Sequence, residues 1–220
     1  MEQGQLARRN QIPLAIKLAY TAFVAVLVPV YWYHYTPVNF LYFCDVALLL
    51  ALPALWLESA YLASMLAVAI TLPQLLWQVD FLSYLLFRVH FPVDLTGYMF
   101  EPQRSLFLRG LSFFHFWLPI LLVWMVWRLG YVRRALTRLI ALSCLVLLLS
   151  YLFATRIDGP AGNVNKVFGP DGTEPQTWMH PLLWLGVLMV AMPVVFYLPT
   201  HRLFCQVMPQ REDRLQAASR

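Results

Sequence analysis

Apolar residues in this chain form long unbroken runs, separated by short polar or proline-containing segments. One run is LFLRGLSFFHFWLPILLVWMVW, from Leu106 to Trp127. About 20 apolar residues in a helix cross the roughly 30 Å of hydrocarbon in a bilayer. Inside hydrocarbon such runs must be helices, because a helix satisfies its own backbone hydrogen bonds. The pattern therefore predicts an all-α, polytopic membrane protein.

The positions of the runs predict about six transmembrane helices in a single integral membrane domain, residues 1–220. The predicted spans are residues 15–33, 38–57, 60–79, 107–127, 134–155 and 181–198, followed by a cytoplasmic tail, 203–220. The basic start and first apolar run could be a signal peptide, but no small-residue cleavage site follows, so we interpret the run as a retained span. Residues 80–105 form a long outer loop between spans three and four. Its many aromatic residues predict an ordered segment that covers the mouth of a pocket.

Composition agrees with this class and narrows the chemistry. Hydrophobic residues make up 60% of the chain, charged residues 12%, and the net charge is +5. We interpret that charge as a signal of membrane topology, and we expect no nucleic-acid partner. Cys44, Cys144 and Cys205 lie in different segments without a CxxC spacing, which argues against disulfides and a structural zinc site. We expect no bound metal and no cofactor.

Basic residues cluster at one set of span ends. An even number of spans places both termini on one side, and three basic groups fall on that same side. They comprise Arg8, Arg9 and Lys17; Arg128, Arg133, Arg134 and Arg138; and Arg202, Arg211 and Arg214. Because positively charged residues are enriched in cytoplasmic loops, this face is predicted to be cytoplasmic.

Three polar residues lie inside predicted spans and are the candidate catalytic residues. Cys44 and Asp45 lie in the second span and His115 in the fourth. At 1.5 Å per residue, Cys44 and His115 are roughly 9 and 12 Å below the outer surface, so they can meet. An ionisable side chain inside a membrane marks a functional site by default. The alternatives are that His115 only bonds a neighbouring helix and that Cys44 is a packing residue.

Other polar residues are predicted in the same outer half of the membrane, and we assign them to substrate binding. They are Gln78, Asp80, Tyr151, Arg156 and His180. Gln78 and Tyr151 have an alternative role in joining helices, and Arg156 and His180 can be explained by snorkelling toward the headgroups. The predicted inner half is almost purely apolar. This one-sided distribution indicates a pocket that opens to the outer face.

The run NFLYFCDVALLLALP, the later run FLRGLSFFHFWLPILLVWMVWRLGYVRRAL and the Asn163–Asn165 loop with VFGP resemble the YwaF-like bacterial integral membrane proteins. That family is similar to the animal transmembrane ether-lipid acyltransferases. The resemblance covers about Val38 to Pro199 and implies a location in the bacterial inner membrane. It also implies a catalytic pair formed by Cys44 and His115. This chain has Phe43 where the family usually has a polar residue before the cysteine.

The implied chemistry is acyl transfer from membrane lipids. A free thiol, with a pKa of about 8.5, needs a neighbouring histidine to accept its proton or to stabilise the thiolate. Cys44 would then form a thioester, Asp45 or Asp80 would orient the imidazole, and Tyr151 or Gln78 would donate to the oxyanion. The sequence thus predicts a lipid acyltransferase or lipid hydrolase.

Two other classes stay open. The first is a non-enzymatic helical scaffold, accessory subunit, or lipid- or quinone-binding protein. The second is a metal-dependent hydrolase that uses His90, Asp94, His115 and His180, although the sequence has no HExxH motif. Membrane lipids are the partners that all of these readings share, and protein partners cannot be read from the sequence.

Overall fold

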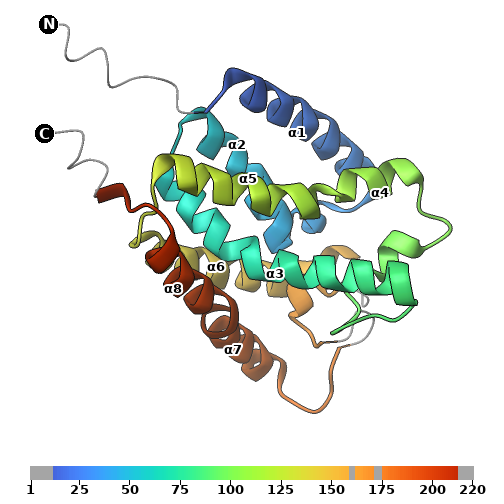
Figure 1. Cartoon of the computed structure of the whole chain (residues 1–220). Coiled ribbons are helices and arrows are strands. Elements are labelled where there is room, and N and C mark those ends of the chain that lie inside the picture. Colours follow the sequence, from blue (N-terminus) through green and yellow to red (C-terminus); the bar gives the residue numbers. More distant parts are fainter. Residues whose placement is uncertain (1–11, 159–161, 171–174, 213–220) are drawn as a thin grey trace, which may run out of the picture.

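The computed structural model describes residues 12–158, 162–170 and 175–212, and the described part is all-α (Figure 1). The helices are α1 (Leu14–His34), η2 (Pro37–Leu41), α2 (Phe43–Trp56), α3 (Ala60–Phe87), η3 (Gly97–Phe100), α4 (Leu106–Ser112), α5 (Phe114–Leu129), α6 (Ala135–Asp158), η5 (Val164–Lys166), α7 (Pro181–Ala191), η6 (Met192–Tyr197) and α8 (Leu198–Val207). Since no β-strand occurs in these ranges, the predicted fold class is confirmed.

Five helical segments are long and apolar enough to cross a membrane. They are Leu14–His34, Ala60–Phe87, Leu106–Leu129, Ala135–Ile157 and Pro181–Val207. Helix α2 is equally apolar but has only 14 residues. At 1.5 Å per residue it is about 21 Å long, which is shorter than the hydrocarbon layer. The chain is therefore a polytopic membrane protein, and the count of six full spans stays a prediction.

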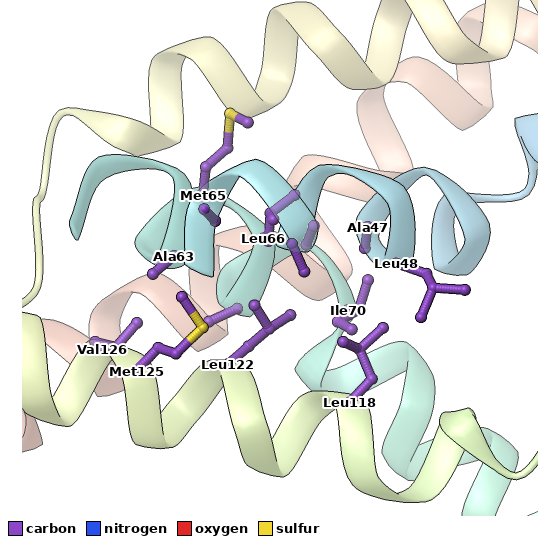
Figure 2. Close-up of a cluster of buried hydrophobic side chains, with 14 of the residues drawn as sticks. Ala47, Leu48, Ala63, Met65, Leu66, Ile70, Leu118, Leu122, Met125 and Val126 are labelled. Carbon is purple, nitrogen blue, oxygen red and sulfur yellow. The ribbon is translucent and has the colours of Figure 1, made fainter. Parts of the chain in front are cut away.

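Helix α3 lies at the centre of the bundle and contacts α2, α5, α6 and α8. In Figure 2, Leu118, Leu122 and Met125 point from α5 toward α3, where Leu66 and Ile70 meet them. Small residues line the facing sides of α2 and α3, and all are buried: Ala47, Ala51, Ala54, Ala60, Ala63 and Ala67. Small side chains let helix backbones approach closely, which is the usual basis of helix packing in membranes.

Helices α3 and α8 extend furthest beyond the predicted ends of their spans. Helix α3 begins after the N-cap Ser59, whose hydroxyl accepts a hydrogen bond from Leu62 N, and continues to Phe87. The apolar residues 81–87 lengthen it, so the outer loop begins at Arg88 and not at Asp80. Similarly, α8 runs to Val207, so the first residues of the predicted tail are helical.

Two predicted spans are interrupted, and each break falls just before a candidate catalytic residue. The second span divides at Tyr42 into η2 and α2, and the fourth divides at Phe113 into α4 and α5. As a result, Cys44 and Asp45 lie in the first turn of α2, and His115 lies in the first turn of α5. Interrupted helices in membrane proteins occur where the broken backbone is buried in protein or lines a cavity.

One end of the bundle, which we call the basic end, collects the start of α1, the α2–α3 turn, the α5–α6 turn and the end of α8 (Figure 1). Lys17 pairs with Glu58 at 2.8 Å across the first two of these segments. Tyr131 N donates to Pro209 O at 2.7 Å, which docks the segment after α8 onto the α5–α6 turn. We call the other end, where Cys44 and His115 lie, the opposite end.

Candidate functional site

The first part of the site is the Cys44–Asp45 pair in the first turn of α2. Cys44 Sγ donates a hydrogen bond to Asp45 Oδ2 at 3.5 Å. Asp45 is only 3% exposed, and its second oxygen, Oδ1, has no hydrogen-bond partner among the described residues. A carboxylate is favoured near a helix N-terminus by the helix dipole. Nevertheless, a buried polar atom without a partner is rare and requires an explanation.

The second part is His115, which α5 presents from its first turn. His115 Nδ1 lies 2.7 Å from the carbonyl oxygen of Ser112. Because a carbonyl oxygen only accepts, Nδ1 carries the hydrogen, and Nε2 of the neutral ring is an acceptor. The imidazole also stacks on Trp77, with ring centroids 4.6 Å apart. Gln78 Nε2 donates to the backbone oxygen of His115 at 3.0 Å, so two α3 residues fix this turn.

Two tyrosines and a serine add hydroxyl groups to the site. Tyr31 OH and Ser112 Oγ are 2.9 Å apart, which joins α1 to the turn that holds His115. Tyr98 comes from η3 in the outer loop, and burial raises the pKa of its phenol. Negative charge on Cys44 would raise the pKa of Tyr98 further. We call Tyr31, Cys44, Asp45, Tyr98, Ser112 and His115 the polar cluster.

The predicted hydrogen bond between Cys44 and His115 is not formed in the described chain. Cys44 Sγ instead bonds Asp45, and His115 Nδ1 bonds the Ser112 carbonyl. The break at Phe113 explains the second contact, because it leaves the Ser112 carbonyl at the end of α4 available to accept from a side chain. Ser112, and not Asp45 or Asp80, therefore orients the imidazole of His115.

Asp80, predicted to bind substrate, holds the outer loop. Its side chain is fully buried and accepts hydrogen bonds from the donors His90 Nδ1, Phe91 N, Leu95 N, Thr96 N and Thr96 Oγ1. The shortest of them, from Thr96 Oγ1 to Asp80 Oδ2, measures 2.6 Å. The imidazole that Asp80 orients is that of His90, which also stacks on Tyr84.

These contacts also account for the residues of the metal-hydrolase alternative. Ligand atoms of Asp80, His90 and Asp94 lie within 4.8 Å of one another. Both oxygens of Asp80 are already occupied by N–H and O–H donors, so hydrogen bonding explains the group without a metal. His180 is not part of this group, because it caps α7 by accepting from Leu182 N at 3.3 Å.

Three of the residues assigned to substrate binding lie elsewhere. Tyr151 packs in an apolar cluster with Phe43, and its ring is tilted against that of Phe168, with ring centroids 5.1 Å apart. Arg156 and His180 are exposed. Among the five residues predicted to bind substrate, Gln78 is the one that contacts the turn of His115 in the described part of the chain.

Asn165 is a positioning residue that the sequence pattern did not predict. Its Oδ1 accepts from Phe43 N at 3.2 Å, and its Nδ2 donates to Leu41 O at 2.7 Å and to Ser150 Oγ at 2.9 Å. Asn165 has a φ of 55°, which asparagine tolerates better than most residues. It thereby bridges the break before α2 and sets the position of Cys44. The sequence feature that could have identified Asn165 was the pair of asparagines, Asn163 and Asn165, in the loop.

Arg104 covers the cluster from the outer loop. Its guanidinium lies over the rings of Tyr35 and Tyr98, at 5.4 and 5.2 Å, and donates to the Tyr35 hydroxyl. Arg104 thus joins the outer loop to Tyr35 at the end of α1.

No protein-family model, curated protein or solved structure matches this chain.

Proposed function

We propose that this chain is a membrane-embedded lipid acyltransferase or lipid hydrolase that uses Cys44 as its nucleophile. The observation that carries the proposal is the contact of Cys44 Sγ with Asp45, whose other oxygen is buried without a partner. Such an atom leaves room for a hydrogen bond from a substrate hydroxyl or amide. Discontinuous helices in membrane proteins often form ligand sites at their N-termini, and both Cys44 and His115 lie in such first turns.

The first half-reaction would transfer an acyl group from a lipid ester to the thiol. Asp45 Oδ2 accepts the Cys44 proton while Sγ attacks the ester carbonyl. The Sγ–C bond forms and the ester C–O bond breaks. Asp45 then returns the proton to the leaving alkoxide, which departs as a lysolipid. First-turn N–H groups without intrahelical acceptors supply donors for the transient oxyanion.

The second half-reaction would consume the thioester. A hydroxyl group of a second lipid, or of water, gives its proton to His115 Nε2 and attacks the thioester carbonyl. The C–S bond breaks, and the imidazolium returns the proton to Cys44. In this scheme Tyr98, whose phenol stays protonated because burial raises its pKa, is a hydrogen-bond donor at the site.

The resemblance to the YwaF-like proteins belongs to the same proposal, since it points to the same cysteine and histidine. We also propose a bacterial inner membrane as the location, with the basic end in the cytoplasm, because exposed Arg134 and Arg138 lie there. Single cysteines introduced as Arg134→Cys and Thr177→Cys in a cysteine-free chain test the topology. Labelling of both positions from one side would refute it.

The test of acyl transfer uses the full chain in nanodiscs with a phospholipid that carries an alkyne-tagged acyl chain. A tagged thioester that hydroxylamine releases should form on the wild-type protein. The Cys44→Ser variant should lose at least about 1000-fold of that signal, as expected for removal of a nucleophile. Cys205→Ser is the matched control and should retain it. Equal labelling of Cys44→Ser and wild type would refute the proposal.

A second candidate function is non-enzymatic lipid or quinone binding, and it is favoured by the missing Cys44–His115 hydrogen bond. A lipid headgroup hydroxyl or a quinone hydroxyl would then satisfy Asp45 Oδ1. Stable, noncovalent retention of one lipid or quinone by both wild type and Cys44→Ser, without a thioester, would support this candidate over acyl transfer.

A further inference from the structure

A cavity at the basic end lies outside the polar cluster and has a volume of about 910 Å³. Its walls are the α2–α3 turn with the start of α3, Glu58 to Tyr61, and the start of α6 with Arg134 and Arg138. Arg211, which follows α8, completes the lining. Ligand cavities commonly span about 300–1000 Å³, so the space is large enough for a polar headgroup.

The cavity carries an excess of positive charge. Arg134 and Arg138 are exposed, stand one helical turn apart, and form no ion pair within the part of the chain that the structure describes. The one acidic residue of the lining, Glu58, is engaged by Lys17 Nζ at 2.8 Å and by Ile12 N at 3.2 Å. Lys17, which is outside the cavity lining, therefore neutralises the charge of Glu58. The positive charge of Arg134 and Arg138 can then attract an anion.

The third arginine is held in place by the fold. Arg211 Nη1 donates to Leu129 O at 2.8 Å, and Arg211 N donates to Tyr131 O at 3.0 Å. The close approach requires glycine at position 130, where φ is +89° and a Cβ would lie 2.8 Å from the Arg211 Cα. The segment after α8 is thus fixed against the α5–α6 turn, and the cavity is a built feature of the fold.

The start of α3 adds to the attraction for anions. Ser59 and Ala60 line the cavity, and the 28-residue helix α3 directs its N-terminus toward it. The N-terminus of a helix carries a partial positive charge and N–H groups without intrahelical acceptors, which together favour phosphate. Tyr61 and Thr137 place hydroxyl-bearing side chains in the same lining.

We infer that this cavity binds the phosphate-containing headgroup of an anionic phospholipid. A lipid source is favoured over a soluble phosphate because the cavity lies where membrane-crossing helices begin and end, at Ala60, Leu129 and Ala135. Trp56 and Trp127 near these ends are exposed, as tryptophans are in the belt at the membrane surface. Basic pockets between helices on the cytoplasmic side recognise anionic headgroups.

The test measures binding of phosphatidylglycerol to the full chain by native mass spectrometry, with phosphatidylcholine as the neutral lipid. Wild type should bind phosphatidylglycerol preferentially. The double variant Arg134→Ala/Arg138→Ala should bind it about 20- to 30-fold more weakly, because each arginine near a lipid surface contributes roughly a fivefold factor. Arg202→Ala is the matched control, since Arg202 is an exposed arginine of α8 outside the lining. It should bind like wild type.

Two results would overturn the inference. An equal loss in Arg202→Ala would mean that only the overall charge of the basic end matters. Displacement of the lipid by inorganic phosphate at low millimolar concentration would mean that a soluble anion is the ligand. The double variant should keep thioester formation at Cys44, so failure of the headgroup site and failure of acyl transfer are separate outcomes.

Discussion

Buried polar side chains are hydrogen-bonded to different extents at the two ends of the bundle. Among the described residues, buried side-chain nitrogen or oxygen atoms without a partner occur in Asp45, Gln74, Arg104 and Arg109. These residues lie in the middle of the bundle or toward the opposite end. At the basic end the buried polar side chains have partners, as in Tyr131 OH with His201 Nδ1 at 2.6 Å and Ser64 Oγ with Val132 N at 2.9 Å.

The two ends also differ in their cysteine–histidine pairs. Cys205 Sγ lies 3.6 Å from His201 Nε2, whereas the predicted pair Cys44 and His115 does not share a hydrogen bond. Cys205 and His201 are four residues apart on one helix, so the helix geometry alone brings them together. Because all of these basic-end groups are satisfied, they are explained by structure. At the opposite end, Asp45 Oδ1 is buried without a hydrogen-bond partner among the described residues, and this atom, not a cysteine–histidine contact, supports the proposed site.

The largest effect is expected for Asp80→Ala. It would leave the donors of residues 90–96 without their buried acceptor and should cost about 3–5 kcal/mol in the free energy of unfolding. Hydrogen exchange of residues 90–97 should accelerate strongly, and the thermal midpoint should fall. The control is Asp94→Ala, because the Asp94 side chain is 61% exposed. If both variants behave alike, Asp80 does not organise the loop.

A contrasting result is expected for Asp45→Asn. The variant removes a buried carboxylate that lacks a partner for Oδ1, so folding should be unchanged or stabilised by about 1 kcal/mol. Thioester formation at Cys44 should nonetheless drop by about 100-fold, because the base is lost. A variant that is both destabilised and fully active would show that Asp45 is a structural residue.

Sequence periodicity predicted the helices well, because long apolar runs have one solution in hydrocarbon. It could not predict the breaks at Tyr42 and Phe113, where the local sequence remains apolar. The first break depends on Asn165, more than 120 residues away, whose side chain bonds both sides of the gap. The prediction assumed continuous helices and compared the depths of Cys44 and His115 in the membrane. It therefore paired these two residues, whereas Cys44 bonds Asp45 and His115 bonds Ser112.

The bridge at the first break is tested by Asn165→Ala. The variant loses the bonds to Phe43, Leu41 and Ser150 and should cost about 2 kcal/mol of unfolding free energy. It should also slow thioester formation, since Cys44 follows directly. Ser150→Ala removes one of the three bonds and serves as the graded control. A cost for Ser150→Ala equal to that of Asn165→Ala would argue against the bridge.

The smallest effect is expected at the basic end, for Tyr131→Phe. Burial raises the pKa of the Tyr131 phenol, so the group is protonated, and no other acceptor for it occurs in the described chain. Its hydroxyl therefore donates to His201 Nδ1, and the loss of this bond should cost about 1 kcal/mol. Tyr61→Phe, which breaks no such bond, should change the free energy of unfolding by less than about 0.5 kcal/mol.

Thioester formation should be the same in both variants, because a paired histidine at this end holds α8 in place and has no part in acyl transfer. If Tyr131→Phe alone lost thioester formation, the reactive cysteine would be Cys205 at the basic end and not Cys44.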